Sequence, residues 1–147
     1  MNVQDYKFKA KSPITQKWVY GNLFVSSEAQ LSFGASAQAF IMSNDGHSYE
    51  VAPETVGVFS GRTDDRGTDI YGGDIIKESY PDGSFFVYRV EFAESAFLAV
   101  DTKRGRKSPL REVGKFGLAK VSVIGNINDN VVAVRNVSDY EYEEEEE

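Results

Sequence analysis

Five basic side chains lie within a nine-residue stretch of the sequence, with no acidic residue among them. They are Lys103, Arg104, Arg106, Lys107 and Arg111, and the next acid is Glu112. Lysine and arginine clustered in this way are suited to contact a phosphate backbone or an acidic protein segment. A solvated loop is the simpler interpretation, and contact with the acidic end of the same chain, weakened by salt, is a third. The stretch is therefore a candidate binding site for nucleic acid or for an acidic partner.

Residues that usually carry catalysis or bind metal ions are scarce. The chain has one histidine, His47, and no cysteine. These counts exclude thiol catalysis, cysteine-ligated zinc and any site with two histidines. A Ser–His–Asp triad would depend on His47 alone, and its place beside a turn favours an ordinary surface or packing role. We expect no cofactor and no metal ion.

Other motifs with known chemistry are incomplete. The acidic segment 64–69 has Asp69 where a calcium-binding EF-hand loop has glycine, so a solvated turn is the better interpretation. Gly114-Lys115 lacks the upstream glycine and the following Ser/Thr of a P-loop. Carboxylates such as Glu91 and Asp101 fall on expected strands, where exposed acids are common. An enzyme with a cryptic carboxylate or metal site stays open as the least favoured alternative.

The net charge of −7 belongs to the last nine residues. Seven of the 23 acids lie in 139–147, so residues 1–138 hold 16 acidic and 16 basic residues. This balance argues against a broad nucleic-acid-binding face but is compatible with a local basic patch. The acidic tail contains Tyr140, Tyr142, Glu143, Glu144, Glu145, Glu146 and Glu147. We expect it to be disordered when alone, and either to solubilise the protein or to imitate nucleic acid or an acidic peptide.

Short stretches with a period of two, separated by turn residues, indicate an all-β protein. The clearest is 85–93, where Phe86, Tyr88, Val90 and Phe92 share one face. Turn chemistry at 80–84 and 44–46 predicts two hairpins. Short helical turns are expected at 27–30 and after Ser108, where Pro109 would take the first helical position. The other expected strands are 18–25, 38–42, 47–51, 74–80, 96–101, 121–127 and 131–137.

These elements predict a mainly antiparallel fold, a small β-barrel or sandwich with an SH3-like meander in its second half. We expect a single domain over 1–138, divisible into an N-terminal subdomain 1–54 and a barrel-like subdomain 55–138, and then the tail 139–147. The N-terminus has no apolar segment typical of a signal peptide, and no apolar run approaches the ~20 residues of a membrane helix. A soluble protein of the cytoplasm is expected.

Residues 55–76 carry a motif that resembles the YopX family of bacteriophage and prophage proteins. The family pattern is Thr-Gly-Leu-x-Asp-x-x-Gly-x-x-Ile-Tyr-x-Gly-Asp-Ile-Val, and it is matched here by Gly61, Asp64, Gly67, Ile70, Tyr71, Gly73, Asp74 and Ile75. Segments 6–10 and 18–23 and the late 123–127, whose Gly125 and Asn126 match a closing Ile-Gly-Asn-Ile, are also similar. Ser60, Arg62 and Gly72 depart from the pattern. The resemblance spans about 6–130 and excludes the tail.

The resemblance implies a phage-encoded, largely β protein of a family without an established activity, so it supplies no catalytic residue. The residues themselves give the motif a structural interpretation. Gly61 and Gly67 suit turns, Ile70, Tyr71 and Ile75 suit a core, and an aspartate such as Asp74 can accept backbone N–H bonds at a bend.

Together these observations predict a non-enzymatic binding or adaptor protein that acts in the cytoplasm of a bacterial host cell. Its partner would be a host or phage protein, or a nucleic acid bound through the basic stretch, with self-association open and no membrane contact. The first alternative is that the acidic tail inhibits a host nucleic-acid-binding protein by mimicry. The second alternative is the enzyme with a cryptic site.

Overall fold

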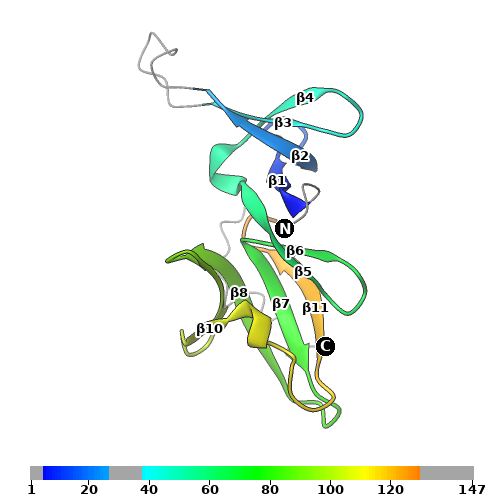
Figure 1. Cartoon of the computed structure of the whole chain (residues 1–147), viewed down its shortest axis with the longest axis vertical. Coiled ribbons are helices and arrows are strands. Elements are labelled where there is room, and N and C mark those ends of the chain that lie inside the picture. The colour runs from blue at the N-terminus through cyan, green and yellow to red at the C-terminus, as the bar shows by residue number, and fades with distance from the viewer. Residues whose placement is uncertain (1–4, 27–37, 130–147) are drawn as a thin grey trace. The chain divides into compact units, whose positions relative to one another are not determined.

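The computed structural model describes residues 5–26 and 38–129 (Figure 1). Within them nearly all regular structure is β, and every strand pairing with a printed register is antiparallel, which confirms the predicted fold class. The predicted strand at 131–137, the helical turn at 27–30 and the acidic tail lie outside the described residues.

Eleven strands and two single 3₁₀ turns follow one another along the described chain. They are β1 (Phe8–Lys11), β2 (Trp18–Val25), β3 (Ala39–Met42), β4 (Ser48–Val51), η3 (Pro53–Thr55), β5 (Gly57–Thr63), β6 (Asp69–Tyr71), β7 (Asp74–Ser79), β8 (Phe85–Ala93), β9 (Ala96–Asp101), β10 (Lys107–Pro109), η4 (Leu110–Glu112) and β11 (Lys120–Asn126). The chain divides into two compact units, Met1–Phe59 (unit 1) and Ser60–Glu147 (unit 2), and the boundary falls inside β5.

Unit 1 is built on antiparallel strands in the order β4-β3-β2-β1-β5. One face of the sheet carries its core, which consists of Ala10, Ala39, Ile41 and Val51, with Leu23 and three other apolar side chains packed against it. The hairpin between β3 and β4 forms as predicted, with Gly46 at φ +86°. Gly21 in β2 has φ +152°, and a Cβ there would overlap the carbonyl oxygen of Met42. Only glycine therefore allows β2 to approach β3 this closely.

Unit 2 is built on an antiparallel sheet in the order β10-β9-β8-β7-β11. The expected meander is present as β7, β8 and β9, paired in sequence order. β10 and β11 form the two edges, so this sheet is open and is not closed into a barrel. Its core consists of the buried side chains of Ile70, Ile76, Val90, Ala99, Leu110, Val113 and Val121.

The turn between β7 and β8 shows why the sequence folds locally as it does. The N–H of Tyr80 donates to the carbonyl of Ser84, and Gly83 takes φ +91°, which glycine adopts without strain. The Asp82 carboxylate accepts the backbone N–H of Ser84 at 2.8 Å, an Asx contact that closes the loop. This turn sets the register in which Glu78 faces Phe86 and Ile76 faces Tyr88.

Two separated parts of the family-like motif meet in the interior of unit 2. The Asp74 carboxylate is fully buried and accepts the N–H of Tyr71 and the side-chain amide of Asn126, each at 2.8 Å. Asn126 is itself 2% exposed and pairs with Asp74 across β11 and β7. Gly73 must be small here, because a Cβ would lie 3.3 Å from the Asn126 amide nitrogen and the residue has φ +93°.

The aspartates of segment 64–69 act on strand β11. Asp64 accepts the N–H of Val123 at 2.9 Å, and Asp65 accepts the N–H of Val121 at 2.6 Å. Asp64 also accepts the N–H groups of Arg66 and Thr68, and these bonds close its own turn. The two carboxylates therefore occupy the place of a neighbouring strand along the free edge of β11.

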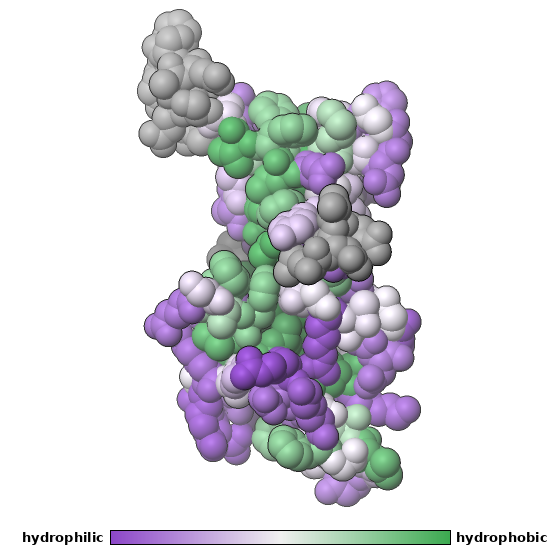
Figure 2. Space-filling model, viewed as in Figure 1, coloured by the Kyte–Doolittle hydropathy of each residue, from purple (hydrophilic) through white to green (hydrophobic). Residues whose placement is uncertain are grey.

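The structure differs from the sequence-based expectations at several elements. Strands β1, β5, β6 and β10 were not expected. The helical turn near Pro109 is η4, which begins one residue later, with Pro109 as its N-cap. On the apolar face of β8 that the sequence indicates, Val90 at the centre is buried, but Phe86 and Phe92 are exposed. On the opposite face, Val87 is also buried. Figure 2 shows hydrophobic residues at the surface among hydrophilic ones.

Candidate functional site

The five basic residues are placed at the β9–β10 connection and just beyond it. Lys103, Arg104 and Arg106 lie in the turn, Lys107 begins β10, and Arg111 lies in η4. Because η4 redirects the chain after β10, Arg111 lines a different hollow, together with Arg62 and Phe97. The structure therefore divides the cluster that the sequence presents as continuous.

Three of the five basic residues line one groove of about 500 Å³. We call it the basic–aromatic groove, and its lining residues are Phe86, Tyr88, Asp101, Arg104, Arg106, Lys107 and Ser108. Tyr88 and Asp101 are direct neighbours across β8 and β9, and Ser108 faces Ala99 across β9 and β10. The groove thus runs across three adjacent strands, β8, β9 and β10.

Aromatic rings form one side of the groove. Phe86 is 38% exposed, and its ring is stacked with that of Tyr88 at a centroid separation of 6.4 Å. Tyr80 meets Phe86 edge-on, with the centroids 6.2 Å apart. The three side chains form a continuous aromatic strip. Phe86 is the exposed member of this strip at the groove, and its ring is accessible to a planar or apolar ligand.

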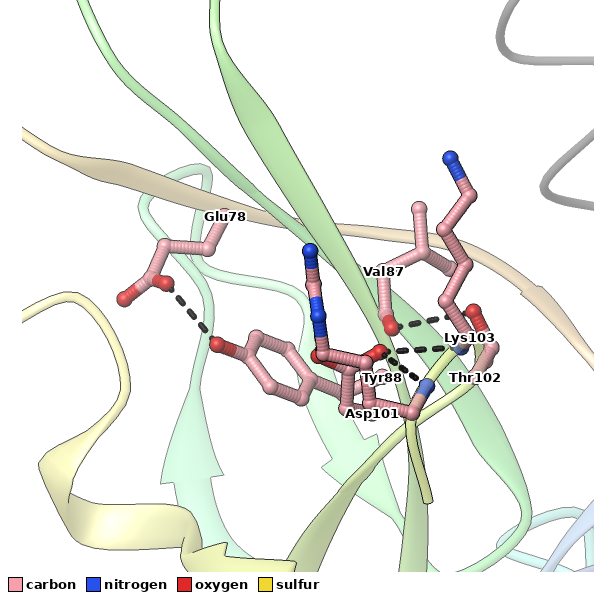
Figure 3. A network of polar contacts seen from close by, with 7 residues as sticks. Glu78, Val87, Tyr88, Asp101, Thr102 and Lys103 are labelled. Atoms are coloured by element: carbon pink, nitrogen blue, oxygen red, sulfur yellow. Dashed lines mark hydrogen bonds and ion pairs between the residues drawn. The ribbon is translucent and has the colours of Figure 1, made fainter. Parts of the chain in front are cut away.

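Tyr88 is held in place from below by a buried carboxylate. Its hydroxyl donates to Glu78 Oε1 at 3.1 Å (Figure 3), and Glu78 Oε2 accepts the backbone N–H of Gly114 at 2.6 Å. Burial, and next the negative charge of Glu78, raise the pKa of the Tyr88 hydroxyl. Tyr88 therefore stays neutral and serves as a fixed donor, which suits the floor of a binding surface and not a proton-transfer group.

The loop that carries the basic residues is ordered by Asp101. One carboxylate oxygen of Asp101 accepts the N–H groups of Lys103 and Arg104, at 2.8 and 3.1 Å (Figure 3). Thr102 anchors the same turn to β8 by donating its hydroxyl to the carbonyl of Val87. Gly105, at φ +70°, allows the tight return to β10. The cations are thus presented from a fixed backbone.

The cations of the groove differ in their partners. Arg104 lies 3.6 Å from Asp101, and Lys107 lies 3.4 Å from Glu91, which Arg89 also contacts at 2.9 Å. The hydrogen bond from Arg89 first, and then both positive charges, lower the pKa of Glu91 against its partial desolvation. Arg106 is exposed, and within the described residues no ion pair holds it. With three cations and one carboxylate in its lining, the groove carries a net positive charge.

The remaining candidates do not form a reactive site in the described residues. His47 is exposed in the β3–β4 turn and lies 3.5 Å from Asp45. Across 5–26 and 38–129, no three His, Cys, Asp or Glu side chains come together in a way that could hold a metal ion. The same residues include no helix with the length and apolar character of a membrane span.

Sequence reasoning missed the aromatic part of the groove and a second cationic cluster. The alternation of apolar residues along 85–93 places Phe86 on the same face of the strand as the buried Val90. Nothing in the local pattern shows that the core packed on this face ends before it reaches Phe86. In unit 1, Lys9 and Lys11 are almost fully buried and lie over the ring of Trp18, at 4.5 and 5.7 Å from its centroid. Their period-two spacing on one face of β1 was the available signal.

Comparisons with known proteins agree with the motif. The family model described as YopX protein matches residues 7–132. The crystal structure of the protein YopX from Bacillus subtilis is similar, with a TM-score of 0.51 and 16% sequence identity, over 89% of this chain and 99% of that one. No curated protein sequence matches the chain. The family match covers nearly all of the described residues and both parts of the Asp74–Asn126 contact, and the chain therefore belongs to the YopX family.

Proposed function

We propose that this protein is a non-enzymatic binding protein of a bacteriophage or prophage, and that it works in the cytoplasm of the host cell. In this proposal the basic–aromatic groove binds a polyanionic segment of a host or phage macromolecule. One observation carries the proposal: Arg104, Arg106 and Lys107 line the same groove as the exposed ring of Phe86. Two other hollows of unit 2 have fewer basic groups, namely Arg66 and Lys120 in one and Arg62 and Arg111 in the other.

A binding role also fits the chemistry of the groove. Its tyrosine has a raised pKa and donates to a buried carboxylate, and its aspartate is occupied by backbone N–H groups of the loop. The raised pKa keeps the Tyr88 hydroxyl protonated, so it acts as a hydrogen-bond donor and not as a nucleophile. The guanidinium group of Arg106, by contrast, is exposed and held by no ion pair within the described residues, and it can make charge-assisted hydrogen bonds to phosphate or carboxylate oxygens.

The test measures binding of fluorescent polyanions, such as oligo(dT), a heparin fragment and poly-glutamate, to the full-length protein by anisotropy. We expect saturable binding that weakens with salt, with a log–log slope near −2 for oligo(dT) because about three cations contact it. The double variant R104E/R106E should lower the affinity by at least roughly tenfold. The matched control R111E reverses a charge of the same stretch outside the groove and should bind nearly as the wild type. Absence of binding to every polyanion, or equal losses in R111E, would refute the proposal.

A further inference from the structure

We infer that the ligand of the basic–aromatic groove is single-stranded nucleic acid, with one unpaired base stacked on the ring of Phe86 and the adjacent phosphates bound by Arg106 and Arg104. The inference rests on the proposed function, because it assigns a ligand class to the same groove. The inference states that the nucleic acid is single-stranded and that a base stacks on Phe86, and neither point follows from the charge of the groove alone.

The first argument is the exposure of Phe86 in a polar setting. The ring of Phe86 is 38% exposed and lines the groove together with three cations and a carboxylate. Tyr88 stacks behind it at an interplanar angle of 29°, and Tyr80 supports its edge. The ring is therefore held in one orientation, and a planar base gains more from such a fixed platform than a flexible acidic side chain does.

The second argument is the spacing between the ring platform and the cations. Tyr88 pairs with Asp101 on β9, and the Asp101 N–H donates to the carbonyl of Arg106 at 2.8 Å. Two strand spacings, about 10 Å in all, thus separate the backbone of the aromatic strip from that of Arg106. An extended arginine side chain spans much of this gap, so a base over Phe86 and its own phosphate beside Arg106 are compatible with one nucleotide.

The third argument is the polar lining between these two ends. Ser108 and Asp101 both line the groove. A serine hydroxyl can donate to and accept from the edge of a base, and that edge is exposed in an unpaired base and hidden in a duplex. Stacking on an aromatic ring with basic groups along the backbone is the usual arrangement for binding single strands. The neutral charge of residues 1–138 agrees with a short local contact in place of a broad duplex-binding face.

The experiment compares the binding of three ligands of similar charge to the full-length protein: a short oligo(dT), a hairpin duplex with the same number of phosphates, and a Glu/Tyr-rich peptide. We expect oligo(dT) to bind at least several-fold more tightly than the other two. Phe86→Ala should weaken oligo(dT) binding by roughly tenfold, and Phe86→Tyr, which keeps the ring, should restore it. The control Phe92→Ala removes another exposed phenylalanine of β8, whose ring centroid lies 4.7 Å from that of Phe97 in a tilted arrangement, and should leave binding unchanged.

A spectroscopic readout separates stacking from a change in fold. In Phe86→Trp, oligo(dT) should quench the emission of the new tryptophan saturably, and the signal of Trp18, the single native tryptophan, is subtracted with the wild type. Melting curves of Phe86→Ala and Phe92→Ala establish that both variants fold. If Phe86→Ala binds oligo(dT) as the wild type does, or if duplex or peptide binds as tightly, the inference is wrong. Loss of affinity in R104E/R106E under those same conditions would leave the proposed polyanion-binding function standing.

Discussion

Asp74 and Asn126, 52 positions apart in the sequence, are joined by a hydrogen bond of 2.8 Å in the buried interior of unit 2. The contact links the central family motif to its closing segment and fixes β11 against β7. Asn126 also accepts the N–H of Asn128 and donates its own N–H to Asp129, so one residue organises the end of the strand. The motif residues of this region thus have a structural role, at a location separate from the residues that line the groove.

Replacing Asn126 by alanine should destabilise unit 2. The substitution leaves one oxygen of the fully buried Asp74 carboxylate without its amide donor, and we expect a loss of about 2–3 kcal/mol in the free energy of unfolding. Thermal unfolding followed by far-UV circular dichroism measures the loss, and amide exchange at Tyr71 localises it. The control Asn128→Ala keeps the backbone bond to Asn126 and should cost much less. Equal effects of the two substitutions would contradict this role of the buried contact.

Replacing Gly21 by alanine should disrupt unit 1. The new methyl group would overlap the Met42 backbone oxygen at a φ of +152°, so the strands must separate, at a cost of about 3 kcal/mol. Trp18 lies in the same strand and reports this unfolding through its fluorescence in a urea titration. Gly46→Ala is the control, because that position has φ +86° but open space around it, and it should cost only about 1 kcal/mol. A smaller effect at Gly21 than at Gly46 would show that the close approach is unimportant.

Acid should weaken unit 2 in part through Asp64. Burial by itself would raise the pKa of Asp64, but the N–H donors of Val123, Thr68 and Arg66 outweigh it and lower the pKa below its ordinary value. Since the folded-state pKa is the lower one, the stabilisation is fully present above about pH 4 and is lost as the pH falls through the folded-state value.

The variant Asp64→Asn tests this linkage. It should be less stable at neutral pH by about 1–3 kcal/mol, because an amide cannot accept all three N–H groups. Its stability should also fall less steeply in acid, as measured by urea unfolding between neutral pH and pH 2.5. Asp82→Asn changes a carboxylate in an exposed turn and should alter the acid limb less. An unchanged acid limb in Asp64→Asn would show that Asp64 does not contribute.

Deleting residues 139–147 should increase the affinity of the groove for oligo(dT). The deletion changes the formal charge from −7 to neutral and removes long-range repulsion of a polyanion. We expect a gain of about threefold or more in low salt that nearly disappears when the Debye length falls below about 8 Å. If the tail itself is the binding element, as in the mimicry alternative, the deletion abolishes binding to a basic host protein instead, and pull-down with both forms separates the two outcomes.

Local chemistry made part of the fold predictable. The Tyr80–Ser84 and Asn44–Gly46 turns follow from proline, aspartate and glycine at positions that require them, and the β7–β8–β9 meander follows from period-two patterning. Strands β1 and β5 pair with each other although they lie far apart in the sequence, β6 has only three residues, and β10 is hidden in a basic run. Similarly, the carboxylates of Asp64 and Asp65 bind backbone groups 59 and 56 positions away, which no local pattern reveals.

Of the candidate site, only the basic residues could be predicted from the sequence. The basic stretch is evident from composition, but its division by η4 and the open side of Phe86 depend on where the core of unit 2 ends. A period of two assigns Phe86 to one face of the strand, but it does not indicate how much of that face is packed against the core. The combination of ring and cations is therefore a property of the folded sheet.

The aspartates along β11 have a consequence for assembly. A strand at the edge of a sheet normally offers unpaired N–H groups to a strand of another molecule, which leads to sheet extension and aggregation. At β11 the N–H groups of Val121 and Val123 already donate to Asp65 and Asp64. Charged oxygens fixed at this edge would also repel the carbonyl groups of an incoming strand. Growth of this sheet past β11, by pairing with a strand of a second copy of the chain, is therefore blocked.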